Sequence, residues 1–171
     1  MKKIILSIAS LLFLGLSVNA QKFAFVDTEY ILDRIPSYKA AQEQINKLSE
    51  EYEAEIEAMY EEVEKLYKSY QNEKVLLTEE QKQQKEEQII AKEKEIKALQ
   101  QKYFGPEGAV FNKRQELVKP IQDEVYKAVK EIALEGGYAA IFDTATGTGI
   151  LYENARYNLS DEVLEKLGYK N

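Results

Sequence analysis

The sequence predicts an α+β protein, mostly α-helical, in which a long antiparallel helical hairpin projects from a small body that contains β-strands. Two observations predict this fold class. Residues 37–104 are rich in Glu, Lys and Gln, contain no glycine or proline, and place apolar residues three and four positions apart, which is typical of an amphipathic helix. Short runs of β-forming residues lie near both ends of the chain, and they can pair only if the helical segment leaves and returns to one place.

Residues 1–20 have the pattern of a secretory signal peptide. Lys2 and Lys3 precede an apolar run over residues 4–16, and Ala20 ends a segment of the kind that a signal peptidase recognises. A run of about 13 apolar residues is too short to span a hydrocarbon core of about 30 Å, so a membrane-spanning helix is the weaker interpretation. We therefore expect export with cleavage after Ala20 and a soluble mature chain. Residue 21 is Gln21, so the cysteine of a lipoprotein is absent from this position.

Composition limits the partners of the protein. The chain has a formal net charge of −7, and residues 1–20 hold two lysines and no acidic residue, so the remainder carries −9. Nucleic acid is not expected as a partner, because phosphate binding needs a basic surface. The sequence contains no cysteine, histidine or tryptophan. An exported chain that has no disulfides, and whose many charged residues leave few apolar residues for a core, is expected to gain stability by association.

The hairpin is predicted from two apolar stripes separated by a pause. On the outgoing limb the stripe runs from Tyr38 to Tyr70, and the pattern pauses over residues 72–77. Thr78 and Gln81 then have the spacing of a capping box that begins a second helix. The stripe of the returning limb consists of Ile89, Ile96 and Tyr103, with Ile90 and Leu99 beside it. A limb of about 40 residues would reach roughly 60 Å at about 1.5 Å per residue, so the hairpin is expected to project as an arm.

The two limbs differ in charge. Residues 37–77 hold 10 Glu and 5 Lys, whereas residues 78–104 hold 6 Glu and 6 Lys. The outgoing limb therefore carries most of the acidic excess.

Glycine and proline cluster after the hairpin, at Gly105 and Pro106. Because proline removes a backbone donor, the returning helix must either kink here or stop and restart. Either outcome makes these two residues a hinge at the root of the arm. Residues 110–134 then carry a broader apolar face and are expected to form a core helix, bent at Pro120 and ended by a left-handed cap at residues 136–137.

Three short strands are predicted in the body, over residues 22–27, 138–143 and 150–152, and the last two would form a β-hairpin around a turn at residues 144–149. So small a sheet leaves exposed edges and buries little surface, so copies from several chains are expected to close one shared barrel. The side chains predicted at this oligomer interface are Phe23, Phe25, Ile141, Phe142 and Ile150.

Two short helices complete the predicted body. Asp27 or Thr28 would cap the first, and Ser160 would cap the second, over residues 161–167. The predicted division of the chain is a body made of residues 21–36 and 105–171 and an arm made of residues 37–104.

No catalytic centre is expected, and neither is a metal or another cofactor. The closely spaced carboxylates of Glu57, Glu61 and Glu64 are explained by a solvated helix face. Because histidine and cysteine are absent, the chain lacks the residues of a hydrolytic triad, a typical zinc site or a thiol nucleophile. Residues 146–149 lack the lysine and the spacing of a phosphate-binding loop and are expected to form a turn.

The order of several motifs resembles that of the Skp (OmpH) family of periplasmic chaperones. The matching features are the predicted signal peptide, residues 23–27 (Phe-Ala-Phe-Val-Asp), the long charged hairpin, residues 113–121 (Lys-Arg-Gln-Glu-Leu-Val-Lys-Pro-Ile), residues 135–138 (Glu-Gly-Gly-Tyr) with Phe142 and Asp143, and residues 161–168 (Asp-Glu-Val-Leu-Glu-Lys-Leu-Gly). The resemblance covers essentially all of the chain after residue 20.

This resemblance implies a homotrimer in the periplasm, with a β-barrel body built from three chains and helical arms around a cavity. Proteins of this family hold unfolded outer-membrane proteins in that cavity without ATP. The better-known members are basic along the arms, whereas the outgoing limb here is acidic, which argues against direct binding to membrane lipid or lipopolysaccharide. An alternative from another class is a structural coiled-coil adaptor that binds one specific folded envelope partner.

The arm residues predicted to contact an unfolded client are apolar or aromatic: Met59, Tyr60, Val63, Leu66, Tyr67 and Tyr70. Aromatic and methionine side chains give adaptable contacts, which suit clients that share no sequence. The alternative is that most of them pack inside the hairpin, as residues of a helical stripe usually do. Tyr60 and Tyr67 lie off the main stripe and are therefore the stronger candidates for client contact.

Overall fold

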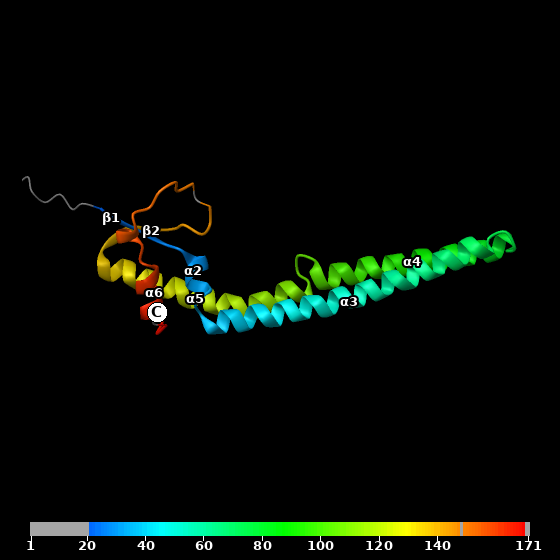
Figure 1. Ribbon diagram of the computed structural model, residues 1–171, viewed down its shortest axis with the longest axis horizontal. Helices are drawn as coiled ribbons and strands as arrows, with labels where there is room; N and C mark the ends of the chain where they lie inside the picture. Colours follow the sequence, from blue (N-terminus) through cyan, green and yellow to red (C-terminus); the bar gives the residue numbers. More distant parts are fainter. Residues whose placement is uncertain (1–20, 148, 170–171) are drawn as a thin grey trace, which may run out of the picture. The chain divides into compact units, whose positions relative to one another are not determined.

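The computed structural model describes residues 21–147 and 149–169. The predicted signal peptide and its cleavage site after Ala20 lie outside the described residues. In chain order the elements are β1 (Lys22–Val26), α2 (Thr28–Leu32), α3 (Pro36–Glu73), α4 (Glu79–Phe104), α5 (Ala109–Gly136), β2 (Tyr138–Asp143), the 3-10 turn η1 (Ala155–Tyr157) and α6 (Ser160–Lys166), as Figure 1 shows. The predicted fold class, mostly helical with a long hairpin and a small sheet, is confirmed.

The chain divides into two compact units. Residues 32–124 form the first, which we call the hairpin unit, and the described residues up to Ile31 and from Val125 form the second, which we call the sheet unit. Helix α5 contributes its first part to the hairpin unit and its second part to the sheet unit.

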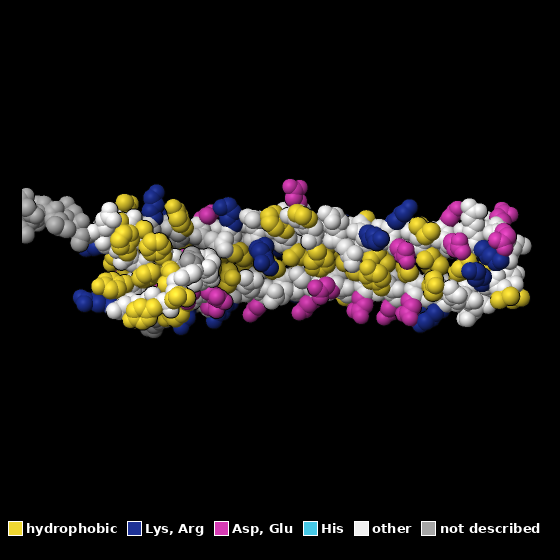
Figure 2. Space-filling model, turned by 90° about the horizontal axis from the view of Figure 1, so that it is seen from above, with side chains coloured by type: hydrophobic (Ala, Val, Ile, Leu, Met, Phe, Trp, Pro, Cys, Tyr) yellow, Lys and Arg dark blue, Asp and Glu magenta, His cyan; other side chains and the backbone are white. Residues whose placement is uncertain are grey.

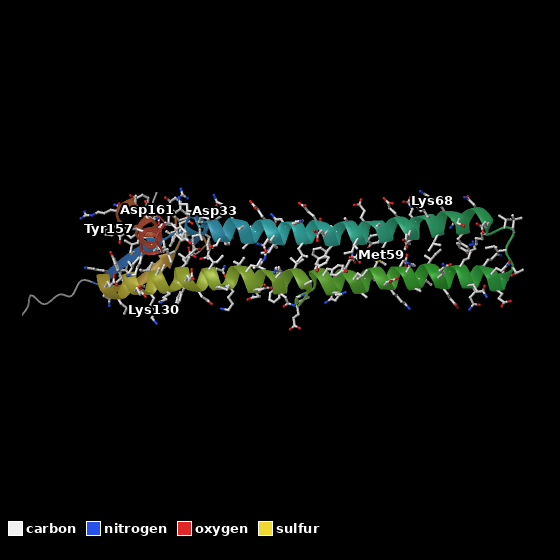
Figure 3. All side chains as sticks on the ribbon, turned by 90° about the horizontal axis from the view of Figure 1, so that it is seen from below. Asp33, Met59, Lys68, Lys130, Tyr157 and Asp161 are labelled. Carbon is white, nitrogen blue, oxygen red and sulfur yellow. The ribbon has the colours of Figure 1, made fainter. Side chains whose placement is uncertain are left out.

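Two antiparallel limbs make the hairpin unit (Figures 1 and 3). Helix α3 begins with Pro36 in its first turn, where the missing N–H is harmless, and runs for 38 residues. Helix α4 begins at the predicted capping box, in which the Thr78 hydroxyl accepts from the Gln81 backbone N–H and the Gln81 side chain accepts from the Thr78 backbone N–H. Together the capping box and the short turn before it reverse the chain, as the sequence predicts.

A thin apolar seam joins the limbs. One cluster contains Ile56 from α3 with Ile96 and Tyr103 from α4. Nearer the start of α3, Ala41 and Ile45 pack with Val118 of α5, so α4 and the first part of α5 together form the returning limb. Figure 2 shows hydrophobic side chains along this seam and acidic side chains along one edge of the hairpin unit.

At the glycine and proline cluster the returning limb stops and restarts: α4 ends at Phe104 and α5 begins at Ala109. The four residues between them form a tight bulge in which the Gly108 N–H donates to the Gly105 carbonyl over 2.9 Å. A Cβ atom added at Gly108 would lie 2.7 Å from the Tyr103 carbonyl oxygen, so the close return of the chain requires glycine there. The seam continues past the bulge, because Ala109 packs against the cluster that contains Tyr103.

The sheet unit contains a two-stranded parallel sheet, with Phe23 opposite Ala140 and Phe25 opposite Phe142. The predicted β-hairpin between residues 138–143 and 150–152 is wrong. Residues 150–152 are not a strand, and Leu151 and Tyr152 are 101% and 81% exposed.

The reason for this difference is the anchoring of the end of β2 to the start of α2. The Asp143 carboxylate accepts from the Thr28 backbone N–H (3.1 Å) and from the Thr28 hydroxyl (2.7 Å), and the Thr144 N–H donates to the Val26 carbonyl (2.8 Å). These bonds join residues more than 100 positions apart, so local sequence patterns do not reveal them.

Polar contacts also fix the short helices of the sheet unit. Asp27 caps α2, since its carboxylate accepts from the Tyr30 N–H over 2.9 Å. The prediction that Ser160 caps α6 is wrong, because Ser160 is the first residue of that helix and its hydroxyl accepts from the Asp27 N–H over 2.8 Å. The Asn158 side chain accepts from the Ser160 N–H over 2.9 Å instead. The left-handed cap after α5 is confirmed, with φ of 66° at Gly137.

Candidate functional site

Two surfaces carry the residues that the sequence analysis singles out: one face of the hairpin unit and the sheet of the sheet unit. Each lies within a single unit.

Three of the six predicted arm residues, Met59, Val63 and Tyr70, contribute to the contact between the limbs. Met59 and Val63 pack against the cluster of Ile56, Ile96 and Tyr103, and Figure 3 shows Met59 between the limbs and Lys68 pointing away from them. Leu66 is half-buried and Tyr70 is 4% exposed. For Met59, Val63 and Tyr70, the structure shows the packing that the alternative interpretation describes.

Tyr70 and Tyr103 link the limbs through their hydroxyl groups. The Tyr70 hydroxyl donates to the Glu86 carboxylate, and this hydrogen bond, with burial and the charge of Glu86, raises the pKa of Tyr70 to about 12. The Tyr103 hydroxyl donates to Glu55 over 2.9 Å, and this bond likewise raises the pKa of Tyr103. The Tyr103 ring also stacks on Tyr52, with centroids 3.8 Å apart.

Tyr60 and Tyr67 lie on the surface of the hairpin unit, 48% and 52% exposed. The Tyr60 hydroxyl accepts from the Gln100 side chain over 3.3 Å, which holds its ring beside the returning limb. A shallow hollow at this point is lined by Glu53, Ile56, Glu57, Tyr60, Gln100 and Phe104. Phe104, 41% exposed, is not among the residues predicted from the sequence. Its position directly after the stripe residue Tyr103 and before Gly105 is the pattern that could have identified it.

The outgoing limb is acidic where it borders this hollow. Residues 48–64 include eight glutamates and no lysine or arginine. Some of these carboxylates are paired: Glu62 lies 3.2 Å from Lys92 and Glu64 lies 2.5 Å from Lys68. The hydrogen bond from Lys68 lowers the pKa of Glu64.

The sheet unit exposes aromatic rings next to its strands. Phe23 and Phe142 are 46% and 42% exposed, with ring centroids 6.2 Å apart, and Phe25 lies 5.9 Å from Phe142. The other predicted interface residues, Ile141 and Ile150, are half-buried. A hollow next to β1 is lined by Gln21, Lys22, Phe23, Phe25, Tyr138, Arg156 and Tyr157.

The edges of this sheet differ. The Leu159 N–H donates to the Phe25 carbonyl over 2.8 Å, and Asn158 forms an isolated bridge with Phe25, so the outer edge of β1 is partly occupied. In the described part of the chain, no strand pairs with the outer edge of β2. An unpaired edge beside exposed aromatic rings is a surface suited to pairing with another chain.

The described residues contain no group of three or more potential metal ligands from Asp and Glu. Glu61 and Glu64 form ion pairs with Lys65 and Lys68 one helical turn away, and Glu57 borders the hollow. Residues 144–147 and 149 follow β2 without joining it to another strand, and Thr148 lies outside the described residues. Over the described ranges, no helix has the length and hydrophobicity needed to cross a bilayer.

A long two-limbed helical hairpin joined in sequence to a small strand-containing unit defines the structural class of this protein. Within that class, the chain belongs to the family described as outer membrane protein (OmpH-like), whose sequence profile matches residues 22–167.

A solved structure supports the same fold. The chain is similar to the crystal structure, at 2.83 Å resolution, of a putative outer membrane chaperone (OmpH-like) from Caulobacter crescentus. The TM-score is 0.63 at 12% sequence identity, and the alignment covers 86% of this chain and 84% of that one. A comparison with curated proteins found no match.

Proposed function

We propose that this protein is an ATP-independent chaperone that holds unfolded outer-membrane proteins in the periplasm and prevents their aggregation. The observation that carries the proposal is the pair of half-exposed tyrosines, Tyr60 and Tyr67, on a hairpin whose other apolar residues mostly form its own seam. Membership of the OmpH-like family and the likeness to a protein described as a putative outer membrane chaperone support it.

The hairpin unit suits weak and reversible binding. Half-exposed aromatic side chains offer apolar area together with a polar tip, so they can contact segments of unrelated sequence. Each contact is weak, but several arms acting on one client would raise its retention through their high effective concentration. Holding a client in this way needs no bound nucleotide.

Assembly into a homotrimer is the second part of the proposal. A two-stranded sheet is marginal alone, and the outer edge of β2 is unpaired next to the exposed Phe23 and Phe142 rings. We infer that the sheets of three chains complete one barrel through Phe23, Phe25, Ile141, Phe142 and Ile150. The arms of the three chains would then surround one cavity.

Gly105 and Pro106 are proposed as the hinge of the arm. Helix α4 ends at Phe104 and α5 begins at Ala109, so the returning limb can bend between them without breaking hydrogen bonds inside either helix. The Tyr52–Tyr103 stack and the Tyr103–Glu55 hydrogen bond lie on the adjoining turn and would limit the movement.

The experiment that tests the proposal measures light scattering while several unrelated outer-membrane β-barrel proteins are diluted from denaturant, with and without this protein and in the absence of ATP. Suppression of aggregation for all of them is expected, together with a trimeric molar mass in solution before client is added. Tight binding to one folded envelope protein without suppression would instead support the structural adaptor. A monomer that does not delay aggregation would overturn both the assembly and the chaperone role.

A further inference from the structure

The hollow on the hairpin unit is lined by both apolar and acidic side chains. Ile56, 7% exposed, lines it, and the rings of Tyr60 and Phe104 also line it and remain accessible. Glu53 and Glu57 line the same hollow from the outgoing limb. These side chains come from both α3 and α4, so the paired limbs fix their relative positions.

The carboxylates of Glu53 and Glu57 are available to a ligand. They lie one helical turn apart on α3, both are exposed, and no side chain of the described residues forms an ion pair with either. Their neighbour Glu55, by contrast, accepts the hydrogen bond from Tyr103, and Glu62 pairs with Lys92. The unpaired acidic charge is therefore placed where accessible aromatic rings also lie.

We propose that this hollow binds a segment of unfolded polypeptide in which an apolar side chain neighbours a lysine or arginine. The apolar side chain would cover Tyr60 and Phe104, and the cation would lie against Glu53 and Glu57, where the Tyr60 ring face also favours it. The inference rests on the proposed function and specifies which client segments the arm prefers.

The physical size of the preference is modest. Exposed ion pairs contribute weakly and are screened by salt, so two of them give roughly a three- to tenfold change in Kd. A preference of this size biases the orientation and residence of a client without preventing its release.

The test compares two fluorescent peptides with the same apolar residues, one flanked by lysines and one by glutamates, binding to the purified full-length protein. Fluorescence anisotropy at low salt is expected to show roughly three- to tenfold tighter binding of the lysine peptide, and the difference should shrink at high salt. The variant Glu53→Gln with Glu57→Gln is expected to abolish the preference. The matched control, Glu43→Gln with Glu50→Gln, removes the same charge from exposed positions of α3 that do not line the hollow and should retain it.

A second pair of variants tests the aromatic side chains that line the hollow. Tyr60→Ser is expected to weaken binding of both peptides, whereas Tyr67→Ser, at a similarly exposed ring outside the hollow, should have a smaller effect. Circular dichroism shows whether each variant keeps its helices. Equal binding of the two peptides to the wild type, or a preference that survives Glu53→Gln with Glu57→Gln, would overturn the inference. If the wild type suppresses aggregation under either of those outcomes, the proposed function stands and only the assigned client preference fails.

Discussion

The hairpin unit and the sheet unit are held together in different ways. In the hairpin unit, each buried residue such as Ile56 or Ile96 faces a position on the other limb that follows from the helical period and the place of the turn. In the sheet unit, Asp27 bonds to Ser160 and Thr28 bonds to Asp143, at sequence separations of 133 and 115. A regular seam can therefore be predicted residue by residue from the sequence, whereas a small body closed by long-range hydrogen bonds cannot.

The largest expected effect is on the seam itself. Ile96→Ala removes a side chain that is 0% exposed and leaves a cavity between the limbs, which should lower the free energy of unfolding by about 2–5 kcal/mol. Ile90→Ala on the same helix is the matched control, because Ile90 is 48% exposed and its loss should cost less than about 1 kcal/mol. Chemical denaturation measures both variants. Equal losses would show that the seam does not hold the hairpin.

The second effect concerns the anchor of the sheet unit. Thr28→Val keeps a similar shape but removes the hydroxyl that donates to the Asp143 carboxylate, which should cost about 1.5–3 kcal/mol because the acceptor is charged. Thr146→Val is the control, since the Thr146 hydroxyl is exposed and makes only a 3.4 Å contact. Hydrogen exchange at β1 and β2 should rise in Thr28→Val and stay unchanged in α4. Faster exchange in α4 as well would mean that the two units do not respond separately.

Alkaline pH should weaken the hairpin unit selectively. The pKa of the Tyr70 hydroxyl is raised from its ordinary value of 10.0 to about 12. Between these two pH values, Tyr70 loses its hydroxyl proton in the unfolded chain but keeps it in the folded chain. The stability present below the ordinary pKa is therefore lost as pH rises through this window. Absorbance of tyrosinate should show a late-titrating component to which Tyr70 and Tyr103 both contribute, and Tyr70→Phe should remove the part that belongs to Tyr70. A wild-type titration in which every tyrosine ionises near its ordinary pKa would contradict the Tyr70–Glu86 contact.

The smallest effect on stability is expected at the exposed tyrosines. Tyr60→Ser with Tyr67→Ser should change the free energy of unfolding by no more than about 0.5 kcal/mol per site, since both rings are about half exposed. Suppression of the aggregation of an unfolded β-barrel protein should nevertheless weaken. Unchanged suppression would remove both residues from the proposed client-binding surface.

The candidate site was partly predictable for the same reason as the hairpin. The phase of the stripe places Tyr60 and Tyr67 off the seam, and the structure exposes both. Whether Met59, Val63, Leu66 and Tyr70 face the other limb depends on which side chains that limb presents to them, and local sequence patterns leave this open. Phe104 was missed because its exposure depends on where α4 stops, which proline and glycine allow at more than one residue.

The two limbs, their turn at the Thr78 capping box and the acidic charge of the outgoing limb follow from local sequence patterns, because helical period, capping and composition act over a few neighbouring residues. The folded chain alone shows that β2 pairs with β1 in parallel, that Ser160 bonds to Asp27 rather than capping α6, and that Glu53, Glu57, Tyr60 and Phe104 border one hollow. Each of these depends on residues distant in the chain. Their approach is set by the competition among many long-range contacts, which no local pattern encodes.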